Sequence, residues 1–138
     1  MIAYLDASVV LRLVLGEPEH LAEWPEVESA VASALTEVEC LRTLDRLSRL
    51  GALTAAELSL RRMAVYHLME AVEVVDVGRP VLRRAAEPFP TPLGTLDAIH
   101  MSTALAWRDA RNQALRMATH DHELATAARS MGMEVMGA

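Results

Sequence analysis

The sequence contains no lysine, because all 13 of its basic residues are arginine. This absence excludes a catalytic or Schiff-base lysine and the phosphate-binding P-loop, each of which requires a lysine amine. Aromatic residues make up only 4% of the chain, which leaves no aromatic platform on which nucleic-acid bases could stack. The single cysteine, Cys40, excludes an internal disulfide and any metal site built from several cysteines.

Long hydrophobic runs are also missing. Arg12 interrupts the first apolar stretch and Glu17 ends it, so no segment approaches the roughly 18 residues of a membrane span. The chain does not begin with the basic segment and apolar core of a signal peptide. We therefore expect a cytoplasmic protein that has no membrane partner.

The composition that remains is that of a globular protein. Hydrophobic residues make up 52% and charged residues 23% of the 138 residues, which is enough for one domain over residues 1–138 with a proper core. The net charge of −6 argues against a protein that coats nucleic acid without specificity. It leaves open an enzyme that acts on phosphates through metal ions held by carboxylates.

Apolar segments alternate with amphipathic ones along the chain. Segments that fit strands cover residues 1–5, 30–35, 72–77 and 115–118, with a further one at 134–136. Helices are predicted over residues 8–15, 18–24, 36–50, 54–70, 81–86, 95–107 and 122–131. Thr36, Thr54 and Thr95 are the expected N-caps of three of these helices. The alternation predicts an α/β fold with a parallel sheet and helices on both faces.

Four acidic residues take equivalent places in this pattern. Asp6 follows the first strand and Asp121 the fourth, whereas Glu39 and Asp97 are expected in the first turn of a helix. All four positions then lie at the carboxyl ends of the strands, where ligands bind in open α/β sheets. Because like charges repel, some of these groups need a raised pKa or a bound cation. Oxygen ligands suit Mg²⁺ or Mn²⁺, and such ions activate water for phosphodiester hydrolysis.

Three of the four acids also have a structural explanation, whereas Asp6, which closes an apolar strand, has less structural purpose. Glu39, three residues after Thr36, fits a capping box, and Asp121 can cap its own helix. Asp97 is favoured by the positive field of a helix N-terminus, without any chemistry. His100, three residues after Asp97, fits either a ligand or a packed side chain within the helix.

Four segments of the chain resemble the VapC type of PIN domain, the ribonuclease toxin of bacterial and archaeal toxin–antitoxin pairs. They are LDASVV at 5–10, SALTEVECLR at 33–42, LDAIHMSTAL at 96–105 and THDHELATAARSMGMEV at 119–135. Their order and spacing match, and together they span nearly the whole chain. The resemblance implies an α/β/α sandwich with a central, mostly parallel sheet flanked by helices.

The resemblance also implies an activity and its residues. It implies a Mg²⁺- or Mn²⁺-dependent endoribonuclease that hydrolyses RNA by a metal-activated water, forms a homodimer and is inhibited by a cognate antitoxin. Asp6 and Asp97 match the central metal ligands, and Glu39 and Asp121 match the acids that complete the pocket. Two polar residues resemble those that line and orient this pocket, namely Thr119 and Ser8.

One alternative from another functional class remains. A protein could keep this fold and act only as a binding module, through protein–protein contacts and without catalysis. The four acids argue against this alternative, because a scaffold gains nothing by gathering like charges at one edge.

Overall fold

A single parallel sheet forms the centre of the computed structural model, which describes residues 1–138. Its strands are β1 (Ile2–Leu5), β2 (Ser29–Ser33), β3 (Glu73–Val75), β4 (Arg116–Ala118) and β5 (Val135–Met136). They are arranged in the order β3-β2-β1-β4-β5, and every neighbouring pair is parallel. The predicted α/β fold with a parallel sheet is therefore confirmed, and β1 is its central strand.

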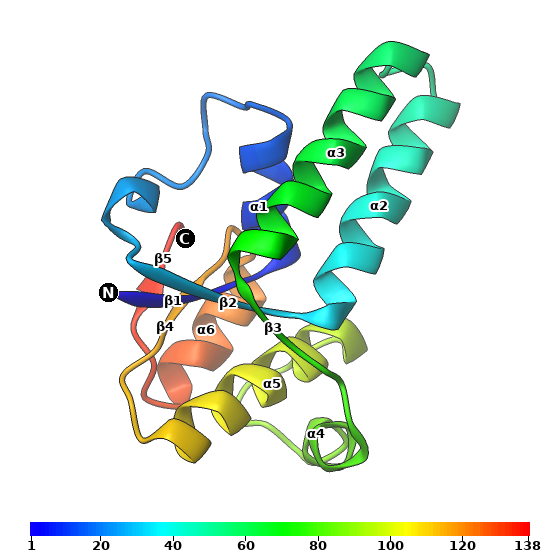
Figure 1. The fold of residues 1–138 in the computed structure, drawn as a ribbon. Helices are drawn as coiled ribbons and strands as arrows, with labels where there is room; N and C mark the ends of the chain where they lie inside the picture. The colour runs from blue at the N-terminus through cyan, green and yellow to red at the C-terminus, as the bar shows by residue number, and fades with distance from the viewer.

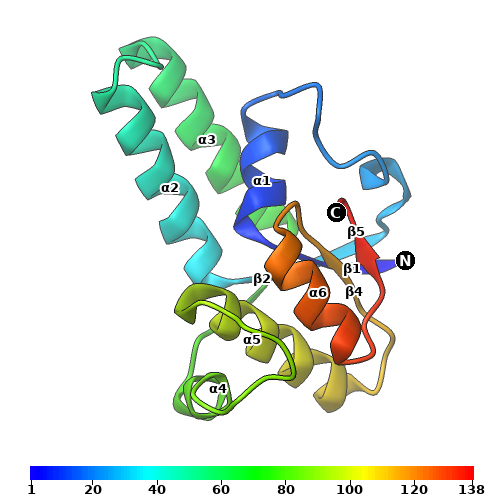
Figure 2. The same cartoon turned by 180° about the vertical axis from the view of Figure 1, so that it is seen from behind.

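Helices cover both faces of this sheet. α1 (Ala7–Val14), α2 (Ala34–Arg49) and α3 (Ala55–Ala71) pack on one face (Figures 1 and 2). The other face carries α4 (Arg79–Ala85), α5 (Thr95–Arg111) and α6 (His122–Ser130). α2 and α3 form a long antiparallel hairpin that extends beyond the edge of the sheet (Figure 1). None of these helices is both long and apolar enough to cross a membrane.

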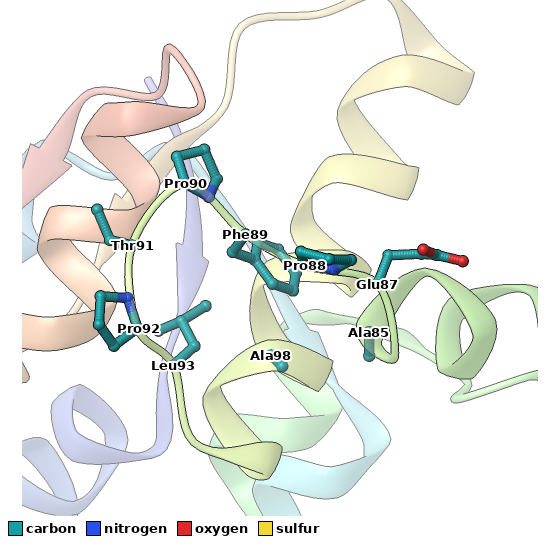
Figure 3. Close-up of a pocket in the computed structure, with 9 residues that line it drawn as sticks. All are labelled: Ala85, Glu87, Pro88, Phe89, Pro90, Thr91, Pro92, Leu93 and Ala98. Carbon is teal, nitrogen blue, oxygen red and sulfur yellow. The ribbon is translucent and has the colours of Figure 1, made fainter.

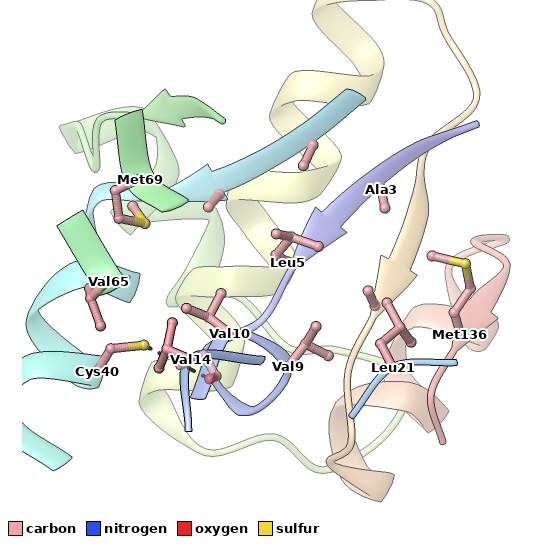
Figure 4. Close-up of a cluster of buried hydrophobic side chains, with 14 of the residues drawn as sticks. Ala3, Leu5, Val9, Val10, Val14, Leu21, Cys40, Val65, Met69 and Met136 are labelled. Atoms are coloured by element: carbon pink, nitrogen blue, oxygen red, sulfur yellow. Dashed lines mark hydrogen bonds between the residues drawn. The ribbon is translucent and has the colours of Figure 1, made fainter. Parts of the chain in front are cut away.

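The alternation of side chains along the strands divides the core in two. Ala3 and Leu5 of β1 point into the cluster beneath α1, α2 and α3 (Figure 4). Tyr4, between them, belongs to the cluster beneath α5 and α6. β2 and β4 divide in the same way, so each face of the sheet has its own apolar core.

The helix predicted over residues 18–24 is wrong. This segment forms turns and then a short 3₁₀ helix, Trp24–Glu26, that contains Pro25. Pro18 and Pro25 leave only seven residues for the helix, too few for a stable isolated helix. Leu21 is nevertheless fully buried, which attaches this connection to the core.

Two of the three predicted N-caps are also wrong. α2 begins at Ala34, and Ser33 caps it by accepting a hydrogen bond from the backbone N–H of Leu35 (3.0 Å). Thr36 is the third helical residue, so the predicted capping box with Glu39 does not form and Glu39 lies in the second turn. Gly94, without a side-chain cap, precedes α5 in place of Thr95. The capping box of α3, between Thr54 and Glu57, is confirmed.

The cap of α2 yields a first test. Ser33→Ala removes the cap and should lower the free energy of unfolding by about 1 kcal/mol. The Thr36 hydroxyl is buried without a hydrogen-bond partner, so Thr36→Val should leave stability unchanged or raise it. Urea unfolding of the two variants measures both effects. A larger loss for Thr36→Val than for Ser33→Ala would restore Thr36 as the cap.

Candidate functional site

Asp6 lies at the end of β1 and is the N-cap of α1, although its side chain does not cap that helix. The residue is 5% exposed, and its backbone N–H donates to the carbonyl of Ala118 at the end of β4. Its Oδ2 accepts hydrogen bonds from the hydroxyls of Ser8 (2.7 Å) and Thr119 (2.9 Å). The two residues predicted to orient the pocket are therefore in contact with the first acid.

Ser8 and Thr119 also connect the ends of the two strands. Ser8 Oγ accepts from the backbone N–H of His120, and Thr119 Oγ1 accepts from that of Asp121, each at 3.0 Å. Each hydroxyl thus donates to Asp6 while it accepts from the loop after β4. These bonds fix the orientation of the Asp6 carboxylate relative to that loop.

Glu39 reaches the same edge from the second turn of α2. Its Oε1 lies 2.5 Å from Nε2 of His100 on α5, and the same nitrogen lies 3.8 Å from Oδ1 of Asp6. The other ring nitrogen, Nδ1, lies 2.7 Å from the hydroxyl of Tyr4 on β1. His100 is fully buried and both of its nitrogens are engaged, so the structure does not place it as a free ligand.

Burial and the neighbouring carboxylates act on the pKa of His100 in opposite directions. Burial lowers the pKa of His100, because it disfavours the charged ring. The hydrogen bond to Glu39 and the charges of Asp6, Glu39 and Asp97 act in the opposite direction. Their combined effect is larger, and the pKa of His100 is raised overall.

Asp97 occupies the first turn of α5, as predicted, and is partly buried. The pKa of Asp97 is raised from 3.8 to about 6, mainly by burial and also by the negative charges of Asp121, Asp6 and Glu39. His100 opposes the shift, and no hydrogen bond to the carboxylate contributes. Asp97 is therefore an uncompensated acid next to three others.

Asp121 is the N-cap of α6 and is exposed. Its Oδ1 accepts from the backbone N–H of Leu124 at 2.9 Å, so the capping role considered from the sequence is present. Its charge still contributes to the raised pKa of Asp97. A capping role and membership of the acidic group are thus compatible.

The four predicted acids share one edge of the sheet, but they are not drawn together around one point. No three histidine, cysteine, aspartate or glutamate side chains are close enough to hold one ion in the conformations seen here. The donor set nevertheless fits Mg²⁺ or Mn²⁺, because it consists of carboxylate and hydroxyl oxygens. The uncompensated Asp97 fits as well, since a cation would neutralise the charge that the neighbouring groups leave unpaired.

The pocket in Figure 3 is separate from the acids. It has a volume of about 460 Å³ and is formed mainly by the proline-rich loop of residues 87–93, with Ala85 and Ala98. None of the four acids lines it, although Ala98 directly follows Asp97. Charge and hydrogen bonding, rather than concavity, therefore identify the site.

Tyr4 is the member of the site that the sequence interpretation missed. Side chains two apart on a strand share a face, so the spacing of Tyr4 and Asp6 is the signal that could have indicated it. Its partner His100 follows Asp97 by three residues, on the same side of α5. Neither pattern alone shows that the two rings meet.

The family described as PIN domain matches residues 3–130. This chain belongs to the PIN-domain family. Two curated relatives from Mycobacterium tuberculosis indicate the VapC type within it. Ribonuclease VapC46 is 33% identical over 96% of this chain and 95% of its own length. Ribonuclease VapC47 is 27% identical over 94% of this chain and 91% of its own length.

The fold of this PIN domain is also similar to that of a solved toxin–antitoxin complex from Klebsiella pneumoniae. The TM-score is 0.61, with 14% identity over 93% of each chain, which supports the fold alone. All four acids fall within the matched residues 3–130. The α/β/α arrangement that the resemblance implied is therefore confirmed.

The raised pKa of Asp97 gives a pH-dependent prediction. The folded protein binds a proton on Asp97 more tightly than the unfolded chain does, so protonation of Asp97 stabilises the fold. This stabilisation is complete below the unfolded pKa of 3.8 and is lost as the pH rises through the folded pKa of about 6. In EDTA, Asp97→Asn should be more stable than wild type by about 1–2 kcal/mol near pH 7, and the two should converge towards about pH 4. Urea unfolding across this range measures the difference.

Glu70→Gln is the matched control, because it removes one negative charge from the exposed surface of α3. Its stability relative to wild type should not follow the same pH dependence. An advantage of Asp97→Asn that stays constant from acid to neutral pH would contradict the repulsion described here.

Proposed function

We propose that this PIN domain, taken as one domain over its 138 residues, is a Mg²⁺- or Mn²⁺-dependent endoribonuclease and the toxin of a toxin–antitoxin pair. The observation that carries the proposal is the uncompensated charge of Asp97 among three other carboxylates at one edge of the sheet. Both curated relatives are named ribonucleases, which supports RNA as the substrate. A location in the cytoplasm stays a prediction from the sequence.

The roles follow from how each acid is held. Asp6, fixed by two hydroxyls through Oδ2, would present Oδ1 to the metal, and Asp97 would supply the second ligand from α5. Glu39 and Asp121 would complete the pocket directly or through water. When bound, the ion would polarise the phosphodiester and lower the pKa of a water molecule.

The orientation of the acids and the binding of substrate would depend on the protein's own groups. Ser8 and Thr119 keep Asp6 in one orientation, and the backbone N–H groups after β4 fix the loop that carries Asp121. Because the four acids repel the phosphates of RNA, substrate would bind productively only once a cation has neutralised part of this charge. The charge of the site would therefore make RNA bind to the metal-loaded protein in preference to the metal-free protein.

Partners belong to the same proposal. The toxin–antitoxin complex among the similar structures supports a cognate antitoxin, and we also propose a homodimer. An exposed apolar side of α3 offers a surface for a protein partner. Leu60, Met63 and Tyr66 lie three residues apart along it and are 61%, 54% and 40% exposed.

The proposal can be tested by thermal unfolding in EDTA and in millimolar Mg²⁺ or Mn²⁺. Because a ligand that binds only the folded state stabilises it, metal should raise the melting temperature of wild type and of Glu70→Gln. Asp97→Asn should respond weakly. On RNA, Asp97→Asn should cleave at least about 100-fold more slowly than the other two, and the products should carry a 5′-phosphate and a 3′-hydroxyl.

The alternative is a PIN-fold binding module without catalysis. It is favoured by the separation of the acids in the present conformations, where no three converge on one point. A melting temperature that metal leaves unchanged in all three proteins, together with intact RNA, would make this alternative the better one. An equal metal response of wild type and Asp97→Asn would instead place the ion away from Asp97.

A further inference from the structure

His100 connects three elements of the site from a fully buried position on α5. Its Nδ1 lies 2.7 Å from the hydroxyl of Tyr4 on β1, and its Nε2 lies 2.5 Å from Oε1 of Glu39 on α2. The two rings meet edge to face, with centroids 5.9 Å apart. Rotation of the imidazole would break both hydrogen bonds, so its orientation is fixed.

The direction of the bond to Glu39 follows from elementary chemistry. An ionised carboxylate can only accept, so Nε2 of His100 must carry the hydrogen and donate it. On a neutral ring Nδ1 then accepts from the Tyr4 hydroxyl, and on a charged ring Nδ1 donates to it. The bond to Glu39 is the same in both cases, so the arrangement does not depend on the charge of the ring.

We propose that His100 is a positioning residue, which holds Oε1 of Glu39 through Nε2–H and so directs the second carboxylate oxygen towards the acidic edge. This inference rests on the proposed function, because it assigns the carboxylate that completes the metal pocket to the control of a buried ring. The same N–H group lies 3.8 Å from Oδ1 of Asp6, so one donor faces acids from two elements. Tyr4 acts one step further away, as the group that orients the ring.

A merely structural histidine would fill space, whereas the geometry gives this one a specific bond. Hydrogen-bond partners of metal ligands commonly change metal affinity by about 10–100-fold when they are removed. His100→Leu removes the donor and keeps an apolar side chain. In His100→Gln the side-chain amide nitrogen can take the place of Nε2. The contrast between these two variants separates donation from packing.

The first measurement is made on the metal-free protein by NMR of histidine labelled with ¹⁵N. In wild type, the Nε2–H proton of His100 should be shifted strongly downfield and should exchange slowly. Glu39→Gln removes the charge of the acceptor, so the resonance should move upfield. A His100 ring protonated only at Nδ1, or a resonance that Glu39→Gln leaves unchanged, would overturn the inference.

The second measurement is the Mn²⁺ dissociation constant by calorimetry, well below the melting temperature. His100→Leu should bind Mn²⁺ about 10–100-fold more weakly than wild type, and His100→Gln should recover most of the affinity. Tyr4→Phe keeps the aromatic ring but loses the hydroxyl that contacts Nδ1 of His100. Its Mn²⁺ affinity should lie between those of His100→Leu and His100→Gln. Tyr4→Phe also provides the test if His100→Leu does not fold.

Val65→Ala is the control for stability, because Val65 is a fully buried residue of α3 and belongs to the core on the opposite face from His100. It should lower the melting temperature and leave Mn²⁺ affinity unchanged. Wild-type affinity in both His100→Leu and Tyr4→Phe would overturn the inference, as would equal weakening in His100→Leu and His100→Gln. Absence of Mn²⁺ binding by wild type would instead overturn the proposed function, and the NMR result still decides whether His100 orients Glu39.

Discussion

Repulsion among carboxylates at one edge of the sheet is the constraint on which the rest of this site depends. Three of the four acids have a donor nearby. Asp6 accepts from two hydroxyls, Glu39 from a buried imidazole, and Asp121 from a backbone N–H at the start of α6. Asp97 has none, and burial together with the charges of its acidic neighbours raises its pKa. The site is therefore organised around one unpaired charge on a rigid helix.

The topology of the sheet produces this arrangement. β1 pairs with both β2 and β4, so Asp6 lies between the segments that follow its two neighbours. Alternation along β1 places Tyr4 on the same face as Asp6, towards α5. The side chains of α5 that face the sheet, including His100, then meet both. An acid at the end of an edge strand would lack one of these two neighbours.

The sequence predicts the fold and the shared edge, because both follow from local patterns of apolar segments and from the rule for parallel strands. Prediction from the sequence fails where two local signals compete. Ser33 and Thr36 are both good N-caps, and only the end of β2 at Ser33 decides between them. It also fails for long-range pairs: Glu39 and His100 are 61 residues apart, and Tyr4 and His100 are 96 apart. Those contacts depend on the crossover of the chain between faces.

The uneven compensation of charge links stability to function. A site in which every carboxylate had its own donor would be more stable without metal, but it would offer a cation little gain in free energy. At neutral pH a bound cation would relieve the repulsion around Asp97, so in the proposed function this relief would add to the free energy of metal binding. The same repulsion would oppose the phosphates of RNA until the cation binds. In the proposed function, a metal-free protein of net charge −6 should therefore hold RNA weakly, and the ion would both complete the pocket and admit the substrate.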